Sequence, residues 1–120
     1  MAKKPEDPRK PLSRAVLHIL LALAEGARHG YAIKQEVEAR TGGTIRLGPG
    51  TLYEAIQRLE ESGLIEEGSA VREPINGQAA QRRYYVLTEH GWDVLRDELR
   101  HLGAIVDYAR TNPRLRKGLA

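Results

Sequence analysis

The segment from Gly48 to Gly68, which reads GPGTLYEAIQRLEESGLIEEG, constrains the fold of this chain more than any other. Leu52, Ile56 and Leu59 recur with helical spacing, and glycines bound the segment on both sides. The pattern predicts a short helix with one apolar face and one polar face, followed by the start of a strand. A short helix with an exposed polar face suits a protein that lays it against another macromolecule.

The start of this helix has two interpretations. Pro49 suits the first helical position, because proline lacks the N–H group that would be unpaired there. Thr51 and Glu54 also match a capping box, which would begin the helix two residues later. The sequence leaves both starts open, whereas Ser62-Gly63 predicts the end.

Two further helices are expected before this one. Residues 12–25 carry apolar side chains on most sides, so the first helix should be largely buried, and Gly26 should end it. Residues 29–40 should form the second helix, which stops at Thr41-Gly42-Gly43. Its inward-facing side chains should be Tyr31, Ile33 and Val37.

Two short strands are expected after the third helix, at residues 64–67 and 83–87. The connection between them, residues 68–82, has no apolar periodicity and contains Pro74, so we expect a long exposed loop. Asn76-Gly77 within this loop is a strong turn signal. The strands and the loop together form a two-stranded β wing.

Thr88 is well placed to cap a final helix, which should end before Asn112-Pro113. The apolar residues of this helix fall at alternating steps of three and four, the heptad pattern of a helix that pairs with another helix. The stripe comprises Trp92, Leu95, Leu99, Leu102, Val106 and Ala109. A small winged domain is already closed by its first three helices, so the stripe predicts a homodimer. The first helix should join this interface through Leu17 and Leu21.

The order of these elements predicts a mainly α fold with a small two-stranded β wing. It is the order of a winged helix-turn-helix with an added C-terminal dimerisation helix. We expect a flexible basic arm at residues 1–11, a winged helix-turn-helix DNA-binding domain at residues 12–88, a dimerisation helix at residues 89–111 and a basic tail at residues 112–120.

The composition of the 120-residue chain agrees with this architecture. Its formal net charge is +3 and its pI is about 9.4, which is compatible with a nucleic-acid partner. Cysteine is absent, which excludes disulfides, cysteine-based zinc sites and thiol nucleophiles, and fits a reducing compartment. We expect no signal peptide and no membrane span, and therefore a cytoplasmic protein.

Neither a metal site nor a catalytic site is expected. The four histidines form no cluster with the spacing of metal ligands. The sequence contains no nucleophile elbow, no phosphate-binding glycine loop and no carboxylate pair in a plausible pocket. We therefore expect a protein that is not an enzyme and that carries no cofactor.

Three blocks of the sequence resemble the PadR-type transcriptional regulators: HGYAIKQEVEART at residues 29–41, GTLYEAIQRLEESGLIE at residues 50–66 and RRYYVLTEHG at residues 82–91. The resemblance implies a bacterial or archaeal homodimeric repressor. Its third helix would enter the major groove of double-stranded DNA, its wing would touch the flanking backbone, and an effector or stress signal would release the DNA. The wing here is longer than the family's common short form, and the single C-terminal helix resembles that of the shorter subfamily.

If the third helix docks in the groove, its polar residues reach bases and their neighbours reach phosphates. Gln57 suits an adenine edge and Arg58 a guanine, whereas Tyr53 would give its hydroxyl to a phosphate. The expected DNA-contacting residues are Lys34, Gln35, Arg46, Thr51, Tyr53, Gln57, Arg58, Arg72, Arg82 and Arg83. The acids Glu54, Glu60 and Glu61 on the same helix leave an alternative open, a winged-helix module that binds a protein without reading DNA.

Trp92 is the only tryptophan in the chain and lies at the head of the dimerisation helix. Two roles remain open for it: lining an apolar pocket for a planar small-molecule effector, or plain packing in the dimer interface. Tyr31 and the pair Tyr84-Tyr85 are expected to be structural residues of the core.

Overall fold

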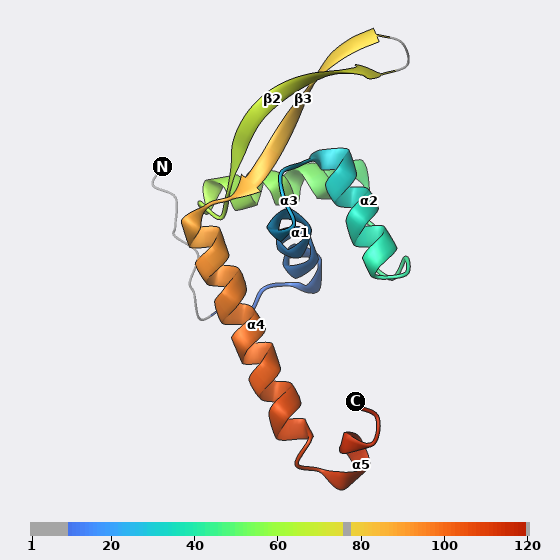
Figure 1. The fold of residues 1–120 in the computed structure, drawn as a ribbon, viewed down its shortest axis with the longest axis vertical. Helices are drawn as coiled ribbons and strands as arrows, with labels where there is room; N and C mark the ends of the chain where they lie inside the picture. The colour runs from blue at the N-terminus through green and yellow to red at the C-terminus, as the bar shows by residue number, and fades with distance from the viewer. Residues whose placement is uncertain (1–9, 76–77, 120) are drawn as a thin grey trace.

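A computed structural model describes residues 10–75 and 78–119, and for residues 69–75 and 78–81 it gives the backbone alone. Its elements are α1 (Arg14–Ala24), β1 (Arg28–His29), α2 (Gly30–Arg40), α3 (Pro49–Glu61), β2 (Ile65–Ile75), β3 (Gln78–Leu87), α4 (Glu89–Ala109) and α5 (Pro113–Arg116). The hairpin of β2 and β3 extends away from the first three helices, and α4 runs in the opposite direction (Figure 1). This arrangement confirms the predicted winged helix-turn-helix with a C-terminal helix.

Caps encoded in the sequence set the helix ends. The Ser13 hydroxyl accepts a hydrogen bond from the Val16 N–H at 3.1 Å, so α1 begins just after Ser13. Of the two starts left open for α3, the structure has the first, with Gly48 as the N-cap and Pro49 as the first helical residue. Gly63 follows the end of α3 with a φ of 76°, a left-handed conformation that favours glycine.

The apolar face of α3 is anchored in one core. Leu52, Ile56 and Leu59 are 2–4% exposed and pack in the same cluster as fully buried Ile19 and Leu20 of α1. Burial of each such side chain stabilises the fold by about 1.5–3 kcal/mol. α3 is therefore held by one face, and its polar face remains outside.

The wing is longer and more regular than the sequence indicates. The prediction of a loop over residues 68–82 is wrong, because β2 and β3 pair through it from Ala70↔Arg83 to Ile75↔Gln78, after a bulge between Glu67 and Ala70. The outer part of the hairpin stands clear of the helices (Figure 1). Backbone hydrogen bonds hold the ladder of this outer part, and they require no apolar alternation in the sequence. The predicted turn at Asn76-Gly77 lies outside the described residues.

A third strand joins the predicted two. β1 pairs with β3 through Arg28↔Tyr85 and His29↔Tyr84, which gives the strand order β1-β3-β2. A strand of two residues is too short to show any alternation in the sequence. β1 attaches the start of α2 to the base of the wing.

Ion pairs join α1, β1 and α2 on the side away from the wing. Arg40 contacts the carboxylates of both Glu25 and Glu36, and Arg28 lies 2.8 Å from Glu25. The hydrogen bond from Arg40 lowers the pKa of Glu25. Because the pKa of Glu25 is lower in the folded state, this pairing stabilises the fold at pH values above the ordinary carboxyl pKa. The stabilisation is lost as the pH falls through the folded-state pKa.

The C-terminal part differs from the expected tail in one respect. Asn112 caps a single helical turn, α5, within the residues expected to be a basic tail. In the described part of the chain, no helix combines the length and the apolar character that a bilayer crossing requires.

α4 joins the domain through a close contact with the connection between α3 and β2. The Thr88 N–H donates to the Leu64 carbonyl at 3.1 Å, and the Thr88 hydroxyl donates to the Gly63 carbonyl. Gly91 packs so closely here that an added Cβ would overlap the Leu64 carbonyl oxygen. Glycine is required at position 91 for this steric reason.

We expect Gly91→Ala to destabilise the fold by about 1–3 kcal/mol, because either α4 or the Leu64 backbone must move. The matched control is Gly50→Ala in α3, where an added Cβ meets no atom within 4 Å. This control should be neutral or stabilising by up to about 1 kcal/mol. Urea unfolding followed by circular dichroism at equal protein concentration measures both, and equal stability of the two variants would contradict the close contact.

Candidate nucleic-acid interface

The outward face of α3 is polar, with acids at its centre. Its exposed residues are Thr51, Tyr53, Glu54, Gln57, Arg58, Glu60 and Glu61. Helical spacing places Glu54, Gln57 and Glu61 opposite the core. The Gln57 amide donates to the Glu61 carboxylate at 3.5 Å. By the same spacing, Tyr53 lies on one flank of the helix and Arg58 on the other.

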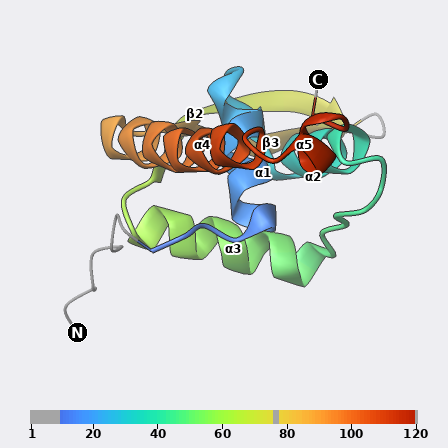
Figure 2. The same ribbon diagram turned by 90° about the horizontal axis from the view of Figure 1, so that it is seen from below.

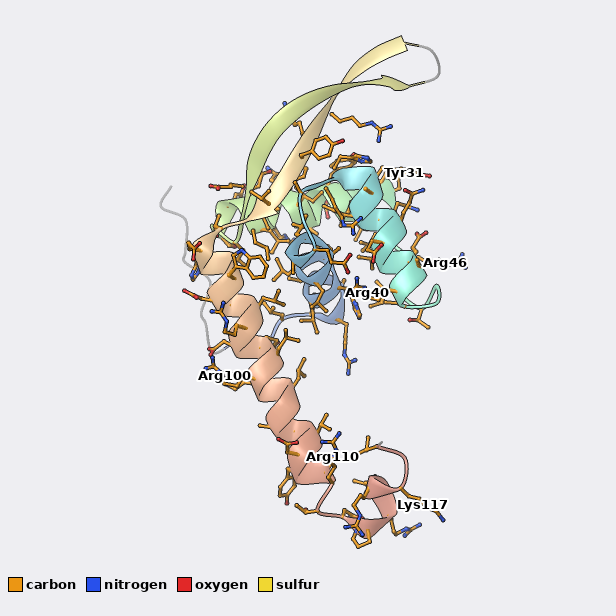
Figure 3. All side chains as sticks on the ribbon, in the orientation of Figure 1. Tyr31, Arg40, Arg46, Arg100, Arg110 and Lys117 are labelled. Atoms are coloured by element: carbon orange, nitrogen blue, oxygen red, sulfur yellow. The ribbon has the colours of Figure 1, made fainter. Side chains whose placement is uncertain are left out.

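A hollow of about 450 Å³ lies on the wing side of α3 and is called the wing-side hollow below. It is lined by His29, Gly30, Tyr31, Tyr53, Arg82, Arg83 and Tyr85. Tyr31 lies at the end of α2 nearest the wing (Figure 3) and is 56% exposed, and Tyr53 is 53% exposed. Tyrosine hydroxyls and guanidinium groups around one space form a set of donors that suits a phosphate.

His29 occupies the base of this hollow and has two competing partners. Its Nδ1 accepts a hydrogen bond from the Ala32 N–H at 3.1 Å, which caps α2. Its Nε2 lies 2.6 Å from Nη1 of Arg82. A neutral imidazole has one acceptor nitrogen, so the cap and the bond from Arg82 are alternatives. His29 was missed among the site residues, although its place directly before a helix marks it as a cap.

Gly30 allows the Tyr53 ring to lie against the first turn of α2. A Cβ added at Gly30 would lie 3.1 Å from both Cε1 and the hydroxyl oxygen of Tyr53. The expectation that Tyr31 belongs to the core is wrong. The inward side of α2 is formed by Gly30, Ile33 and Val37, and Tyr31 lies about 100° around the helix from Gly30.

Tyr85 is 6% exposed and belongs to the core, as expected. Burial raises the pKa of its hydroxyl, which therefore remains protonated at neutral pH. Tyr84 is half-buried, and its ring meets the His29 ring edge-on, with centroids 5.5 Å apart. Both tyrosines support the hollow from the strand β3.

Lys34, Gln35 and Arg46, which were also predicted to contact DNA, do not line the wing-side hollow. Lys34 pairs with Glu38 at 2.8 Å, and Gln35 is exposed on α2. Arg46 donates to the Gly43 carbonyl at 3.3 Å and lies beyond α2, on the side of the domain away from α4 (Figure 3). The side chain of Arg72 lies outside those described. The structure thus gathers Tyr53, Arg82 and Arg83 around one hollow and leaves Lys34, Gln35 and Arg46 outside its lining.

The predicted dimer residues divide into a covered set and an uncovered set. Leu17 and Leu95 are 8% and 3% exposed, because they pack in the core of their own chain. Leu21 and Leu102 are half-buried. Trp92, Leu99 and Val106 remain 37–42% exposed along α4. Ile105 and Tyr108, off the heptad stripe, are more exposed still, at 63% and 80%.

α4, which carries these exposed apolar residues, lies apart from α3 in the fold (Figure 2). Figure 2 shows α1 between α4 and α3. A surface formed by α4 would therefore leave α3 and the wing accessible.

The helical core, the three-stranded sheet and the exposed polar helix define a winged helix-turn-helix protein with a DNA-binding fold. The family model of the PadR-like transcriptional regulators matches residues 19–97, which is most of the chain. The chain belongs to this family, as its three sequence blocks predict.

Curated relatives agree with this assignment. The chain is 38% identical over 86 residues to the transcriptional regulator Rv3488 of Mycobacterium tuberculosis, covering 72% of this chain and 73% of that protein. It is 39% identical over 84 residues, or 70% of its length, to an uncharacterized 37.1 kDa protein in transposon TN4556 of Streptomyces fradiae. It spans 21% of the length of that protein, and 63% of protein X of Lysinibacillus sphaericus.

Solved structures share the fold. RosR of H. salinarum superposes with a TM-score of 0.63 at 28% identity, covering 94% of this chain and 90% of that chain. PadR of Bacillus subtilis, in complex with operator DNA, superposes with a TM-score of 0.59 at 25% identity, covering 70% of this chain and 45% of that chain.

The contact between Gly30 and Tyr53 can be tested by a double-mutant cycle. Gly30→Ala should destabilise the protein by about 1 kcal/mol when Tyr53 is present, because the ring must move. In a Tyr53→Ala background the same change should be neutral or stabilising. The expected coupling is on the order of 1 kcal/mol in the free energy of unfolding. Additive effects of the two substitutions would show that the two residues do not touch.

Proposed function

We propose that this regulator binds double-stranded operator DNA as a homodimer and represses transcription. The observation that carries the proposal is the exposed α3 with the wing-side hollow on its flank. In the proposed complex α3 enters the major groove, while Tyr53, Arg82 and Arg83 hold phosphates of the flanking backbone. The solved complex of B. subtilis PadR, a structural neighbour, with operator DNA supports this mode of DNA binding.

In this complex, affinity and base choice come from different parts of the molecule. Glu54 and Glu61 lie at the centre of the exposed face of α3 and repel phosphates, so this face adds little affinity through charge. Gln57 is the proposed reader of an adenine, and it must leave its bond to Glu61 to do so. Thr51, in the first turn of α3, would assist Gln57 in reading bases. Lys34, Gln35, Arg46 and Arg72 are proposed as secondary backbone contacts.

The proposed dimer forms through α4. Trp92, Leu99 and Val106 carry exposed apolar surface along a helix of 21 residues, and Leu21 and Leu102 add their half-buried side chains. Leu17 and Leu95 support this surface from below, because they hold α4 on its own domain. A two-fold axis through α4 would place two copies of α3 about 34 Å apart, on successive turns of a pseudo-palindromic site.

Trp92 is the proposed point of effector control. It is 38% exposed and directly follows Gly91, where α4 contacts the domain. A planar apolar effector that stacks on the indole would alter the packing of α4 and thereby the spacing of the two α3 helices. Release of DNA would follow from that change in spacing.

Base reading by Gln57 can be separated from phosphate binding by Arg83. Gln57→Ala should relax the preference at one base pair by about 1–3 kcal/mol. Arg83→Ala should weaken binding to all sequences alike. It should also lower the salt slope, the slope of the logarithm of the binding constant against the logarithm of the salt concentration, by about 1 per protomer. Fluorescence anisotropy on duplexes selected from a random library measures both effects, with Arg96→Ala on α4 as the control that should leave binding unchanged.

Two outcomes would overturn the proposed function. If the wild-type protein retains no duplex from the library, α3 and the wing serve a protein partner instead. If Gln57→Ala leaves every base preference intact, α3 is not the reading helix.

The dimer is tested by Leu99→Asn, which places an amide on the exposed stripe. We expect a monomer at micromolar concentration and a loss of DNA affinity on the order of 100-fold, because the two half-sites are no longer linked. Arg100→Asn, at the next residue and off the stripe, should remain a dimer. Sedimentation velocity measures the oligomeric state, and a monomeric wild-type protein would contradict the proposed interface.

A further inference from the structure

A second hollow, of about 380 Å³, lies on the other flank of α3 and is called the arm-side hollow below. Its polar lining consists of Lys10, Ser13, Arg58 and Ser62. Its apolar lining includes Val16 of α1 and Leu59 of α3. It thus joins the start of α1 to the flank of α3 that faces away from the wing.

The two cations of this hollow are available to a ligand. Among the residues that the structure describes, neither Lys10 nor Arg58 forms an ion pair, and both are exposed. Six other arginines of the described chain differ in this respect. Those at positions 28, 40, 83, 96, 100 and 110 each lie within 4.0 Å of a carboxylate. The arm-side hollow therefore keeps its positive charge uncompensated within the described chain.

The hydroxyl groups add one donor. Ser13 accepts a hydrogen bond from the Val16 N–H, which leaves its own O–H group able to donate. Ser62 donates to the Arg58 carbonyl at 2.8 Å, so its proton is already engaged. Two cations and the Ser13 hydroxyl thus face one space with an apolar wall. Such a wall strengthens the attraction for an anion, because it excludes water from one side.

The position of the hollow identifies its anion. A helix with its side chains is about 10–12 Å across and fills a major groove about 12 Å wide. Residues opposite the core then meet base edges, and residues on the two flanks meet the phosphates of the two strands. Arg58 lies on the flank opposite to Tyr53, so the two hollows flank α3 on either side.

We propose that the arm-side hollow binds a DNA phosphate, held by Lys10, Arg58 and the Ser13 hydroxyl. This phosphate belongs to the strand opposite to the one held by the wing-side hollow. Arg58 is thereby a phosphate-binding residue, in place of the guanine reader that the sequence indicates. The inference rests on the proposed function, because it requires α3 to lie in the major groove.

The test compares Arg58→Lys with the double variant Lys10→Ala, Arg58→Ala. Anisotropy is measured at several NaCl concentrations on duplexes selected by the wild-type protein. The double variant should bind every sequence more weakly, and its salt slope should fall by about 0.9 per protomer. Arg58→Lys should keep both the slope and the base preferences, because a phosphate accepts either cation whereas guanine requires the bidentate fork. Arg96→Ala is the matched control, and circular dichroism confirms folding.

Two results would overturn the inference alone. In the first, Arg58→Lys loses the preference at a single G·C pair while the slope is unchanged, which identifies a base reader. In the second, the double variant binds as the wild type does. Failure of the wild-type protein to bind any duplex would instead overturn the proposed function, and this inference with it.

Discussion

The contact between the first turn of α4 and Gly63-Leu64 fixes the relative positions of all the other parts. α3 ends just before it, β2 begins just after it, and β3 delivers the chain back to it through the pair Ile65↔Leu87. The two hydrogen bonds from Thr88 and the close approach of Gly91 leave little freedom at this point. The end of α3, the base of the wing and the start of α4 are therefore joined at one point.

This junction gives α4 mechanical control over α3 in the proposed dimer. Trp92 follows Gly91 directly, and its backbone N–H donates to the Thr88 carbonyl at 2.9 Å. A change in packing at the indole would therefore act within one helical turn of the junction. Packed interfaces tend to switch between discrete arrangements, so a small shift here can become a change in the spacing of the two reading helices. The fold thus places the proposed effector surface directly beside the junction between α4 and the domain.

Local rules predict the helices of this protein well, and tertiary contacts account for what they miss. The Thr88 cap and the apolar stripe of α3 are each visible in a few adjacent residues, whereas the Ser13 cap was not predicted and the first helix was expected to begin at residue 12. The extended wing is not visible in this way, because a hairpin that stands clear of the helices (Figure 1) is held by backbone hydrogen bonds and needs no apolar alternation. Tyr31 was misplaced because Gly30, which has no side chain to signal burial, occupies the inward position of α2.

The candidate site could be predicted only in part, for the same reason. Tyr53, Arg82 and Arg83 were named separately, but their convergence with His29 depends on the pairing of β1 with β3, and β1 is too short to predict. Likewise, Lys10 and Arg58 share a hollow only because the start of α1 packs beside α3. Each hollow is lined by residues from several segments, so no single stretch of the sequence predicts it.

The distribution of charge around α3 fits selection among DNA sites better than tight binding to any DNA. Glu54 and Glu61 face outward, while the cations lie on the two flanks. A carboxylate accepts hydrogen bonds from base amino groups but repels phosphates. In the proposed complex, a helix that is shifted along or across the groove brings these acids towards the backbone and loses affinity. When α3 is correctly placed in the major groove, these acids lie over base edges and phosphates occupy both hollows. In the proposed complex the acids would thus disfavour wrong sites, and specificity would arise from repulsion as well as from the contacts of Gln57.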